Sequence, residues 1–206
     1  MTHPIYTIGH SNRSQETLVA LLRQHGITSV CDVRSQPYSR LHPQFGRERL
    51  CHDLEVSGIA YVFLGKELGG RSPSPASYVD GKIQYDRIAK TTVFQEGLTQ
   101  LIRLTASHRI AILCAEKDPL VCHRTLLVAR ELARHGVEVG HILGDGAIES
   151  QSQAEMRLLR DLNLPIEDMF RSRAEILDDA YKRRSEVVGY RLSEGPARAS
   201  AGQRRV

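Results

Sequence analysis

The 206-residue sequence lacks any long apolar run. Its apolar stretches stay well below the roughly 20 residues that a membrane-spanning helix requires. The first five residues also lack the basic cluster that opens a secretory signal. We therefore expect a protein that remains in the cytoplasm and has no membrane partner.

Most of the chain lacks an excess of charge. The formal net charge is +4, but residues 182–206 alone hold seven lysines and arginines and two glutamates, a net charge of +5. Residues 1–181 are therefore close to neutral, which argues against a broad nucleic-acid surface. The basic end is expected to be disordered and to attract nucleic acid at most loosely, in a salt-sensitive way.

Cysteine is scarce and irregularly spaced. The four cysteines are Cys31, Cys51, Cys114 and Cys122. Cytoplasmic thiols stay reduced, so each is a packing residue, a nucleophile or a metal ligand. The sequence has neither the Cys-x2-Cys pair of structural zinc sites nor the Cys-x5-Arg loop of cysteine phosphatases. Cys31 and Cys51 lie in apolar or helical contexts and are interpreted as packing residues.

Segments rich in β-branched residues alternate with amphipathic segments along the first 143 residues. Strands are predicted at residues 4–8, 27–33, 60–64, 109–114 and 137–143. Helices are predicted after a Ser14 cap, at residues 47–56, after a Thr92/Gln95 capping box and at residues 122–134. The alternation predicts a three-layer α/β fold with a mostly parallel sheet and helices on both faces. Its first strand, helix and strand predict a parallel pair joined by a right-handed crossover.

A helical extension is predicted behind this domain. Two pairs have the spacing of a capping box, Ser150/Gln153 and Ser172/Glu175. They predict helices at residues 151–162 and 172–184 that pack on the body through Leu158, Leu159, Leu162, Ile176, Leu177 and Tyr181. The expected organisation is an α/β domain at residues 1–146, a helical extension at 147–188 and a basic, disordered tail at 189–206.

Polar side chains follow three of the predicted strands. The first strand is followed by His10 and Ser11, the second by Asp32, Arg34 and Ser35, and the fourth by Cys114, Glu116, Cys122, His123 and Arg124. The carboxyl ends of parallel strands share one edge of a sheet, where helix N-termini favour anions. We expect these residues to line one cleft that binds a small anionic ligand.

The segment at residues 114–124 contains the candidate nucleophile. It places Cys122 at or beside a helix N-terminus, flanked by His123 and Arg124. The helix dipole and neighbouring cations both lower the pKa of a thiol in that position. Cys122 is therefore predicted to be a nucleophile or redox thiol. Cys114, at the end of an apolar strand, is interpreted as a packing residue.

Residue type suggests the supporting roles. His123 or His10 would carry a proton, and Asp32 or Glu116 would orient the base. Arg34 and Arg124 would hold an anionic substrate, and Arg40 could join Arg34 in clamping it. The alternative is structural, with the same charges forming ion pairs that tie loops to the sheet.

Two other uses of these residues stay open. Cys114, Cys122, His123 and His10 could supply soft ligands to zinc, although their spacing is irregular. The cleft could also belong to a non-catalytic module that recognises a nucleotide or a nucleic-acid end, helped by the basic tail. The oligomeric state does not follow from the sequence.

Several separated motifs together resemble one family. They are Tyr6-Thr7-Ile8-Gly9-His10-Ser11, Asp32-Val33-Arg34-Ser35, Pro43-Gln44-Phe45, Leu68-Gly69-Gly70 and Cys114-Ala115-Glu116 through Cys122-His123-Arg124. The chain resembles the bacterial family called domain of unknown function 488 from about residue 5 to residue 142. Residues 168–181 look like the extension of its longer members. The resemblance implies a compact α/β domain and marks these motif residues, but it brings no reaction. The residues themselves suggest an enzyme acting on a small anionic or phosphorylated substrate, with a nucleotide-derived compound as one candidate.

Overall fold

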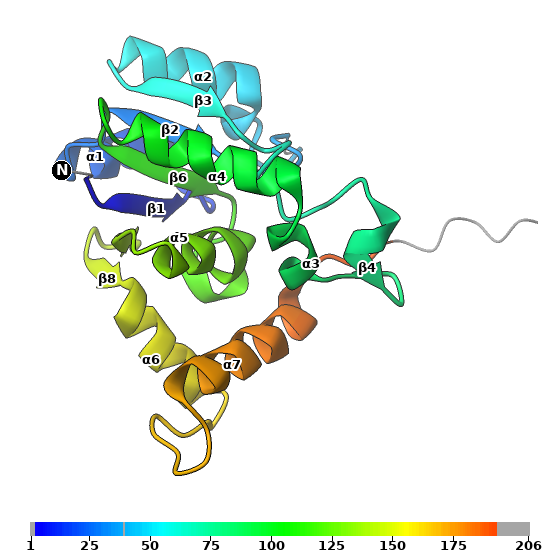
Figure 1. Ribbon diagram of the computed structural model, residues 1–206. Coiled ribbons are helices and arrows are strands. Elements are labelled where there is room, and N and C mark those ends of the chain that lie inside the picture. Colours follow the sequence, from blue (N-terminus) through cyan, green and yellow to red (C-terminus); the bar gives the residue numbers. More distant parts are fainter. Residues whose placement is uncertain (1–2, 39, 193–206) are drawn as a thin grey trace, which may run out of the picture.

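A six-stranded sheet forms the centre of the molecule (Figure 1). The computed structural model describes residues 3–38 and 40–192. The strand order is β3-β2-β6-β1-β7-β8. The bounds are β1 (Ile5–Gly9), β2 (Ser29–Asp32), β3 (Ala60–Phe63), β6 (Ile110–Cys114), β7 (Val139–Ile142) and β8 (Ile148–Ser150). All neighbours are parallel except β7 and β8, which confirms the predicted mostly parallel sheet.

The position of β6 differs from the simplest expectation. The sequence suggested that β1 and β2 form a neighbouring parallel pair, but β6 lies between them and pairs with both. All five β6 residues are buried. A strand with two apolar faces is most stable at the centre of a sheet that helices cover on both sides, so β6 displaces β2 from β1.

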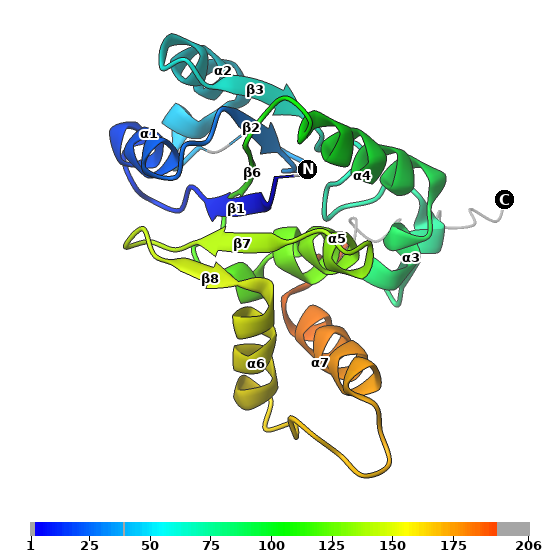
Figure 2. The same cartoon turned by 60° about the vertical axis from the view of Figure 1, so that its left-hand side comes forward.

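Helices cover both faces of the sheet, so the molecule has three layers (Figure 2). One face carries α1 (Gln15–Gln24) and α2 (Arg47–Val56), and the other carries α4 (Thr92–Leu104) and the helix made of η4 (Arg124–Ala129) and α5 (Arg130–Arg134). Each face has its own apolar core. Ile8 and Val30 point to the α1 side, whereas their neighbours Ile5 and Cys31 point to the other. Because helices cover both faces, these strands carry apolar side chains on both of their sides.

Local capping sets the helix ends, with one correction. The Ser14 side chain accepts the backbone N–H of Thr17 and begins α1, as predicted. For α4, however, the cap is Thr91, which accepts the N–H of Phe94, and not the predicted Thr92/Gln95 box. The Gln95 side chain instead donates to the Ala89 carbonyl. Both adjacent threonines are suitable N-cap residues, and although only Thr92 has a glutamine three residues later, the helix begins after Thr91.

The extension begins one strand later than the sequence suggested. Residues 148–150 form β8, an edge strand of the sheet that was not predicted, so the α/β body reaches Ser150. Both predicted capping boxes are present, at the starts of α6 (Gln151–Asp161) and α7 (Arg173–Val188). Of the six residues predicted to pack on the body, Leu158, Leu159, Ile176 and Tyr181 are buried, and Leu162 and Leu177 are partly buried against the same core.

A small hairpin stands beside the main sheet, also unpredicted because its strands are only two residues long. It consists of β4 (Tyr78–Val79) and β5 (Lys82–Ile83), flanked by η2 (Pro75–Ser77) and α3 (Tyr85–Ala89). The chain beyond α7 pairs with it: the N–H of Ile83 donates to the Tyr190 carbonyl, and the N–H of Leu192 donates to the Gly81 carbonyl. Residues 189–192, which the sequence placed in a disordered tail, are therefore paired with this hairpin. Residues 193–206 lie outside the described residues.

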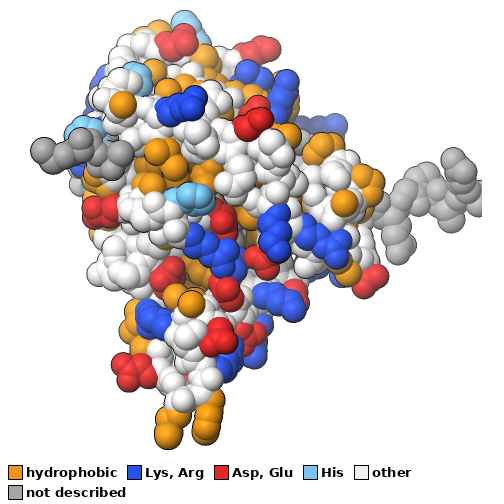
Figure 3. Space-filling model, viewed as in Figure 1, with side chains coloured by type: hydrophobic (Ala, Val, Ile, Leu, Met, Phe, Trp, Pro, Cys, Tyr) orange, Lys and Arg blue, Asp and Glu red, His pale blue; other side chains and the backbone are white. Residues whose placement is uncertain are grey.

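Acidic and basic side chains interleave on the face shown in Figure 3. Part of the basic charge of residues 182–206 belongs to α7, where Arg183 pairs with Asp179 and Arg184 with Asp161. Among the described residues, no helix is long and apolar enough to cross a membrane.

Candidate active site

A cavity of about 250 Å³ lies at the carboxyl end of β6. It is lined by Arg34, Ser35, Gln36, Gly70, Arg71, Tyr85, Cys114, Ala115, Glu116, Val121, Cys122, His123, Val188 and Tyr190. Five of the ten predicted catalytic and binding residues line this cavity, namely Cys122, His123, Glu116, Arg34 and Ser35, and the other five do not. The second and fourth predicted strands contribute Arg34, Ser35 and the cysteine segment, whereas the first contributes no lining residue.

Close backbone packing brings the cysteine segment to the sheet edge. Gly9, at the end of β1, lies so near the next loop that a Cβ there would come within 1.8 Å of the Glu116 carbonyl oxygen. The chain then turns through η3 (Pro119–Val121), which Asp118 caps by accepting the N–H of Leu120. The loop therefore returns Cys122 to the end of the strand that carries Cys114.

Cys122 caps the helix that follows it. Its carbonyl accepts the N–H groups of Thr125 and Leu126, and its Sγ lies 3.5 Å from the backbone nitrogen of Arg124, which donates to it. A sulfur in this position meets the positive end of the helix dipole. The structure thus places Cys122 at a helix N-terminus, as the sequence predicted.

Both cysteines share one carboxyl group. Glu116 Oε2 lies 2.9 Å from Cys122 Sγ and 3.1 Å from Cys114 Sγ. Glu116 as a residue is exposed at the cavity, but this oxygen reaches back to the two thiols. Cys114 and Cys122 are only 3% and 2% exposed. Cys114 is therefore a buried residue, as interpreted from sequence, and also a member of the polar cluster.

His123 has a defined orientation. Its Nε2 lies 2.9 Å from the Val33 carbonyl oxygen, and since a carbonyl can only accept, this nitrogen carries a proton. Its Nδ1 faces the sulfurs, 3.6 Å from Cys114 and 3.9 Å from Cys122. Gly70 packs on the ring, where a Cβ would come within 2.7 Å of the His123 Cγ. The ring is thus held with Nδ1 toward the thiols.

Arg124 is a buried cation without a carboxylate partner among the residues that the structure describes. It is 1% exposed, and its guanidinium donates to the backbone carbonyls of Glu116 (2.6 Å) and Lys117 (3.1 Å). A buried charge is costly unless an opposite charge lies nearby. The Cys122 sulfur supplies that charge when it is a thiolate.

The pKa directions agree with this charge distribution. Burial opposes ionisation of Cys122, but the Cys114 thiol, Arg124 and His123 together hold the pKa of Cys122 well below its usual value. The pKa of Cys114 is raised well above its usual value by burial and by its neighbour Cys122. Desolvation raises the pKa of the Glu116 carboxyl. Burial alone would lower the pKa of His123, but Cys122 raises it. One thiol is therefore poised as a thiolate and the other as a thiol.

Three further predicted residues, Asp32, Arg34 and His10, form a second cluster, of which Arg34 also lines the cavity. Asp32 is fully buried, and its carboxylate accepts from Arg34 Nε (2.9 Å), from Arg34 Nη2 (2.6 Å) and from the Tyr61 hydroxyl (2.7 Å). Arg34 Nη1 donates to the Phe45 carbonyl and to His10 Nε2. Asp32 thus contacts Arg34, and neither His10 nor Arg124, the two partners that the sequence suggested. The ion-pair arrangement weighed as an alternative is present for this pair.

His10 is held away from the thiols. Its Nδ1 donates to the Ser11 carbonyl, its Nε2 accepts from Arg34, and its ring stacks on Phe45 with the centroids 4.2 Å apart. Burial lowers the pKa of His10 to about 4, so it is neutral near pH 7. His10 therefore contacts Arg34 and helps to orient its guanidinium.

Three predicted binding residues lie apart from one another. Ser35 lines the cavity, where its Oγ accepts the N–H of Arg71 at 3.0 Å. Ser11 does not line this cavity but a second, more open depression, together with Arg13 and Lys117. Arg40 is exposed on the loop before α2 and does not line the cavity.

Sequence reasoning missed several residues of the cavity wall. Arg71 donates to Gln36 Oε1 at 2.6 Å and lies over the ring of Tyr190, 4.2 Å from its centroid. Tyr190 and Val188 come from the extension. The breaker-rich run before Arg71 marked an irregular loop, but no local pattern indicated where that loop or the end of α7 would lie.

A metal ion has one set of candidate ligands among the described residues. The donor atoms of Cys114, Cys122 and His123 all lie within 4.8 Å of one another. The hydrogen bond from His123 to a backbone carbonyl is typical of a histidine whose other nitrogen binds metal. Of the four zinc ligands that the sequence suggested, three therefore converge, and His10 stays apart.

The fold and the site define an α/β protein with a buried pair of thiols, an oriented histidine and a carboxyl group at the carboxyl ends of parallel strands. Residues 14–130 match the family described as domain of unknown function DUF488. The match covers more than half of the chain, so the chain belongs to this family, and the resemblance seen in its motifs is confirmed. No curated protein and no solved structure matches the chain.

Proposed function

We propose that this protein is an enzyme in which Cys122 is the nucleophile toward a small anionic substrate bound in the cavity. One observation carries the proposal. Cys122 Sγ lies at the wall of the cavity and meets an N-terminal helix N–H, a carboxyl group and an imidazole within 4 Å. Nucleophilic cysteines are activated by these three kinds of neighbour.

Two groups are proposed to handle protons. Glu116 Oε2 is close enough to Cys122 to take its proton, and the raised pKa of Glu116 and the lowered pKa of Cys122 favour that transfer. His123 faces the sulfur with Nδ1 and supports the thiolate when protonated. Glu116 is then the group that can return a proton to a leaving group.

Among the proposed anion-binding residues, Arg71 has the most guanidinium donors left for a ligand. Its side chain is exposed at the cavity, and its guanidinium donates to Gln36 Oε1. Arg34 also lines the cavity, but most of its donors contact Asp32, His10 and Phe45. Arg124 supports an anion through its charge, since its guanidinium donates to backbone carbonyls. A small phosphorylated or carboxylated compound fits this distribution.

Alkylation of the native protein across pH tests the nucleophile. We expect iodoacetamide to modify Cys122 well below the unperturbed thiol pKa of about 8.5, before Cys31 and Cys51, as mapped by mass spectrometry. The Cys122→Ser variant should lose the early reaction, and Cys51→Ser, altered on α2, should keep it. Resistance of Cys122 until the protein unfolds would contradict the proposal.

A pair of reagents tests the charge of the substrate. Iodoacetate and iodoacetamide are similar in size but differ in charge, so an anion-binding cavity should raise the rate ratio in favour of iodoacetate. Arg71→Met should lower that ratio, whereas Arg49→Met, on the exposed side of α2, should not. Inorganic phosphate should protect Cys122 from both reagents by mass action. An unchanged ratio in Arg71→Met would remove Arg71 from the binding site.

Zinc binding is a second candidate, favoured by the donor spacing. A tetrahedral zinc separates a sulfur ligand from a nitrogen ligand by about 3.6 Å, and the two observed sulfur–Nδ1 distances are 3.6 and 3.9 Å. Titration with Co²⁺ distinguishes the candidates, because thiolate ligation produces an intense near-ultraviolet band. A tight band lost in Cys114→Ser and in Cys122→Ser would favour the metal centre over the free nucleophile.

The non-catalytic alternative remains a proposal as well. A module that binds a nucleotide or a nucleic-acid end through this cavity would bind without turnover, and its affinity would fall steeply with salt. Removal of residues 193–206 tests the contribution of the basic tail without disturbing α7. Salt-dependent binding that survives Cys122→Ser and is lost on this truncation would favour the binding module.

A further inference from the structure

Two thiols, and not one, contact the carboxyl group of the site. Cys114 Sγ and Cys122 Sγ lie within 4.8 Å of each other, and both lie within hydrogen-bond distance of Glu116 Oε2. Cys114 belongs to the central strand β6, whereas Cys122 follows the loop at residues 115–121. The first sulfur is therefore held by the sheet, and the second by the loop that returns the chain to the end of β6.

The roles of the two sulfurs differ by position. Cys122 Sγ accepts an N–H at the start of a helix, which favours the attacking form of a thiol. Cys114 has no helix terminus and sits at the end of a buried strand, next to Glu116, which can accept its proton. A buried thiol beside a nucleophilic one is arranged to react second.

We propose that Cys114 is the resolving thiol for Cys122, so that the pair cycles between dithiol and disulfide when a small hydroperoxide oxidises Cys122. This inference rests on the proposed function, since it takes Cys122 as the nucleophile. It adds a substrate class and a catalytic role for Cys114.

The first step oxidises one sulfur. The Cys122 thiolate attacks the terminal oxygen of the hydroperoxide, the O–O bond breaks, and the alcohol or water leaves after gaining a proton. Cys122 becomes a sulfenic acid, and the hydroperoxide is reduced by two electrons. Glu116, within 2.9 Å of the reacting sulfur, is placed to supply the proton.

The second step joins the sulfurs. Cys114 transfers its proton to Glu116, and its Sγ attacks the Cys122 sulfur. The S–O bond breaks, the hydroxyl leaves as water with that proton, and a disulfide forms. A small thiol reductant restores both thiols by exchange and is itself oxidised to a disulfide.

The dimensions of the site select the oxidant class. The two residues are 2% and 3% exposed, and the cavity holds about 250 Å³. A protein disulfide cannot bring its sulfur to Cys122 through such a space, but a hydroperoxide of a few heavy atoms can. The cationic wall at Arg71 extends this class to hydroperoxides that carry a negative group.

The experiment uses the full chain with Cys31→Ala and Cys51→Ser, which leaves only the two thiols of the site. The protein is treated with hydrogen peroxide, and its free thiols are then counted by alkylation under denaturing conditions. We expect both thiols to disappear together, the mass to fall by two hydrogen atoms, and dithiothreitol to restore them. Peptide mapping should show a Cys114–Cys122 disulfide.

Variants in this background separate the steps. In Cys114→Ser, hydrogen peroxide should still oxidise Cys122, but the sulfenic acid should persist and be trapped by dimedone. In Cys122→Ser, Cys114 should stay alkylatable. Glu116→Gln should slow closure of the disulfide more than the first dimedone-reactive step. If Cys114→Ser does not fold, a quenched time course on the background protein replaces it, with dimedone labelling of Cys122 expected before the disulfide.

The outcomes distinguish the two proposals. Persistent dimedone labelling of Cys122 without a disulfide would overturn the role of Cys114 and leave the nucleophile in place. Two thiols that stay alkylatable after peroxide treatment would overturn this inference, and the nucleophile would fall with it only if Cys122 of the native protein also resisted iodoacetamide. Thiols that become protected only on adding zinc, and are recovered by a chelator and not by dithiothreitol, would overturn this inference in favour of a metal centre.

Discussion

The α/β body and the C-terminal extension are held together by different kinds of contact. Parallel strands and two apolar cores organise the body, which contains all of residues 14–130 matched by the family. The extension, α6 and α7 with residues 189–192, adds no strand to the main sheet. Yet Val188 and Tyr190 form part of the cavity wall beside the thiols. The extension therefore lies outside the main sheet but completes the wall of the candidate active site.

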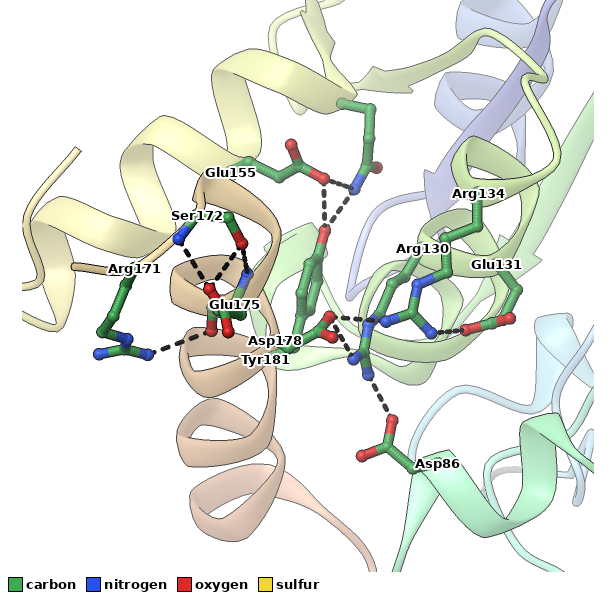
Figure 4. Close-up of polar contacts among 11 residues, drawn as sticks. Asp86, Arg130, Glu131, Arg134, Glu155, Arg171, Ser172, Glu175, Asp178 and Tyr181 are labelled. Atoms are coloured by element: carbon green, nitrogen blue, oxygen red, sulfur yellow. Dashed lines mark hydrogen bonds and ion pairs between the residues drawn. The ribbon is translucent and has the colours of Figure 1, made fainter. Parts of the chain in front are cut away.

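Polar side chains join the two regions. Arg130 of α5 is buried and donates to Asp86 of α3 at 2.7 Å and to Asp178 of α7 at 2.9 Å (Figure 4). Arg134 reaches the same Asp178 oxygen at 2.6 Å. In the same view the Tyr181 hydroxyl of α7 donates to Glu155 of α6. This network fixes the position of α7 and hence of the chain that follows it.

Removal of the extension should have the largest effect. Truncation after Ser150 exposes the core that contacts Leu158, Leu159 and Ile176, each worth about 1.5–3 kcal/mol of burial. Against a total stability of about 5–15 kcal/mol, we expect a body that is unfolded or melts far below the full chain in circular dichroism. Truncation after Leu192 is the matched control and should melt with the full chain. Equal melting of both fragments would mean that the extension does not stabilise the body.

The protein should lose more stability when the two carboxylate partners of Arg130 are neutralised than when Arg130 itself is replaced. Neutralising both partners of Arg130, as Asp86→Asn with Asp178→Asn, leaves a buried cation unpaired and should cost about 2–4 kcal/mol. Arg130→Met fills similar space and leaves two half-exposed carboxylates, so it should cost less. Denaturant unfolding of the variants measures the difference. A larger loss in Arg130→Met would show that packing of the arginine on Tyr181 dominates over its charge.

Acid should weaken the body and its junction with the extension. Burial lowers the pKa of His10 and of His141 to about 4, and His141 donates to Gln151 at the start of α6. The unfolded chain binds these protons near pH 6.5, so stability is highest above that pH and falls as the pH drops toward 4. Each histidine should contribute a loss of about 3 kcal/mol.

Denaturant unfolding at a series of pH values checks this expectation. His141→Asn keeps an acceptor near Thr7 and removes the titrating group, so its stability should depend less steeply on pH between about 6.5 and 4. A slope equal to that of the unaltered protein would exclude His141 as a source of the acid sensitivity.

The smallest expected effect concerns the wall that the extension supplies. Tyr190→Ala removes the ring under Arg71, a contact worth about 1 kcal/mol, and widens the cavity. Cys122 should then react with a bulky maleimide a few times faster, with little change in melting temperature. Tyr190→Phe keeps the ring and should react at the original rate. Equal rates in all three proteins would show that Tyr190 does not control access to the thiols.

Much of the fold and part of the site could be predicted from local patterns. The predicted segments at residues 47–56 and 109–114 correspond to α2 and β6, and both capping boxes of the extension are present. These features depend on periodicity and on hydrogen bonds across three or four residues. The two-residue strands β4 and β5 and the edge strand β8 were missed, because such short segments carry no periodicity and exist only through their partners.

The sequence by itself determined the α/β class, the helix caps at Ser14, Ser150 and Ser172, and the placement of Cys122 between a turn and a helix, with His123 and Arg124 beside it. Only the tertiary structure decided which polar residues meet. It turned Arg34 onto Asp32, held His10 away from the thiols and brought Arg71 and Tyr190 to the cavity. The physical reason is range: caps and periodicity involve neighbours in sequence, whereas these contacts depend on strand order and on loops whose conformations are set by packing across the whole domain.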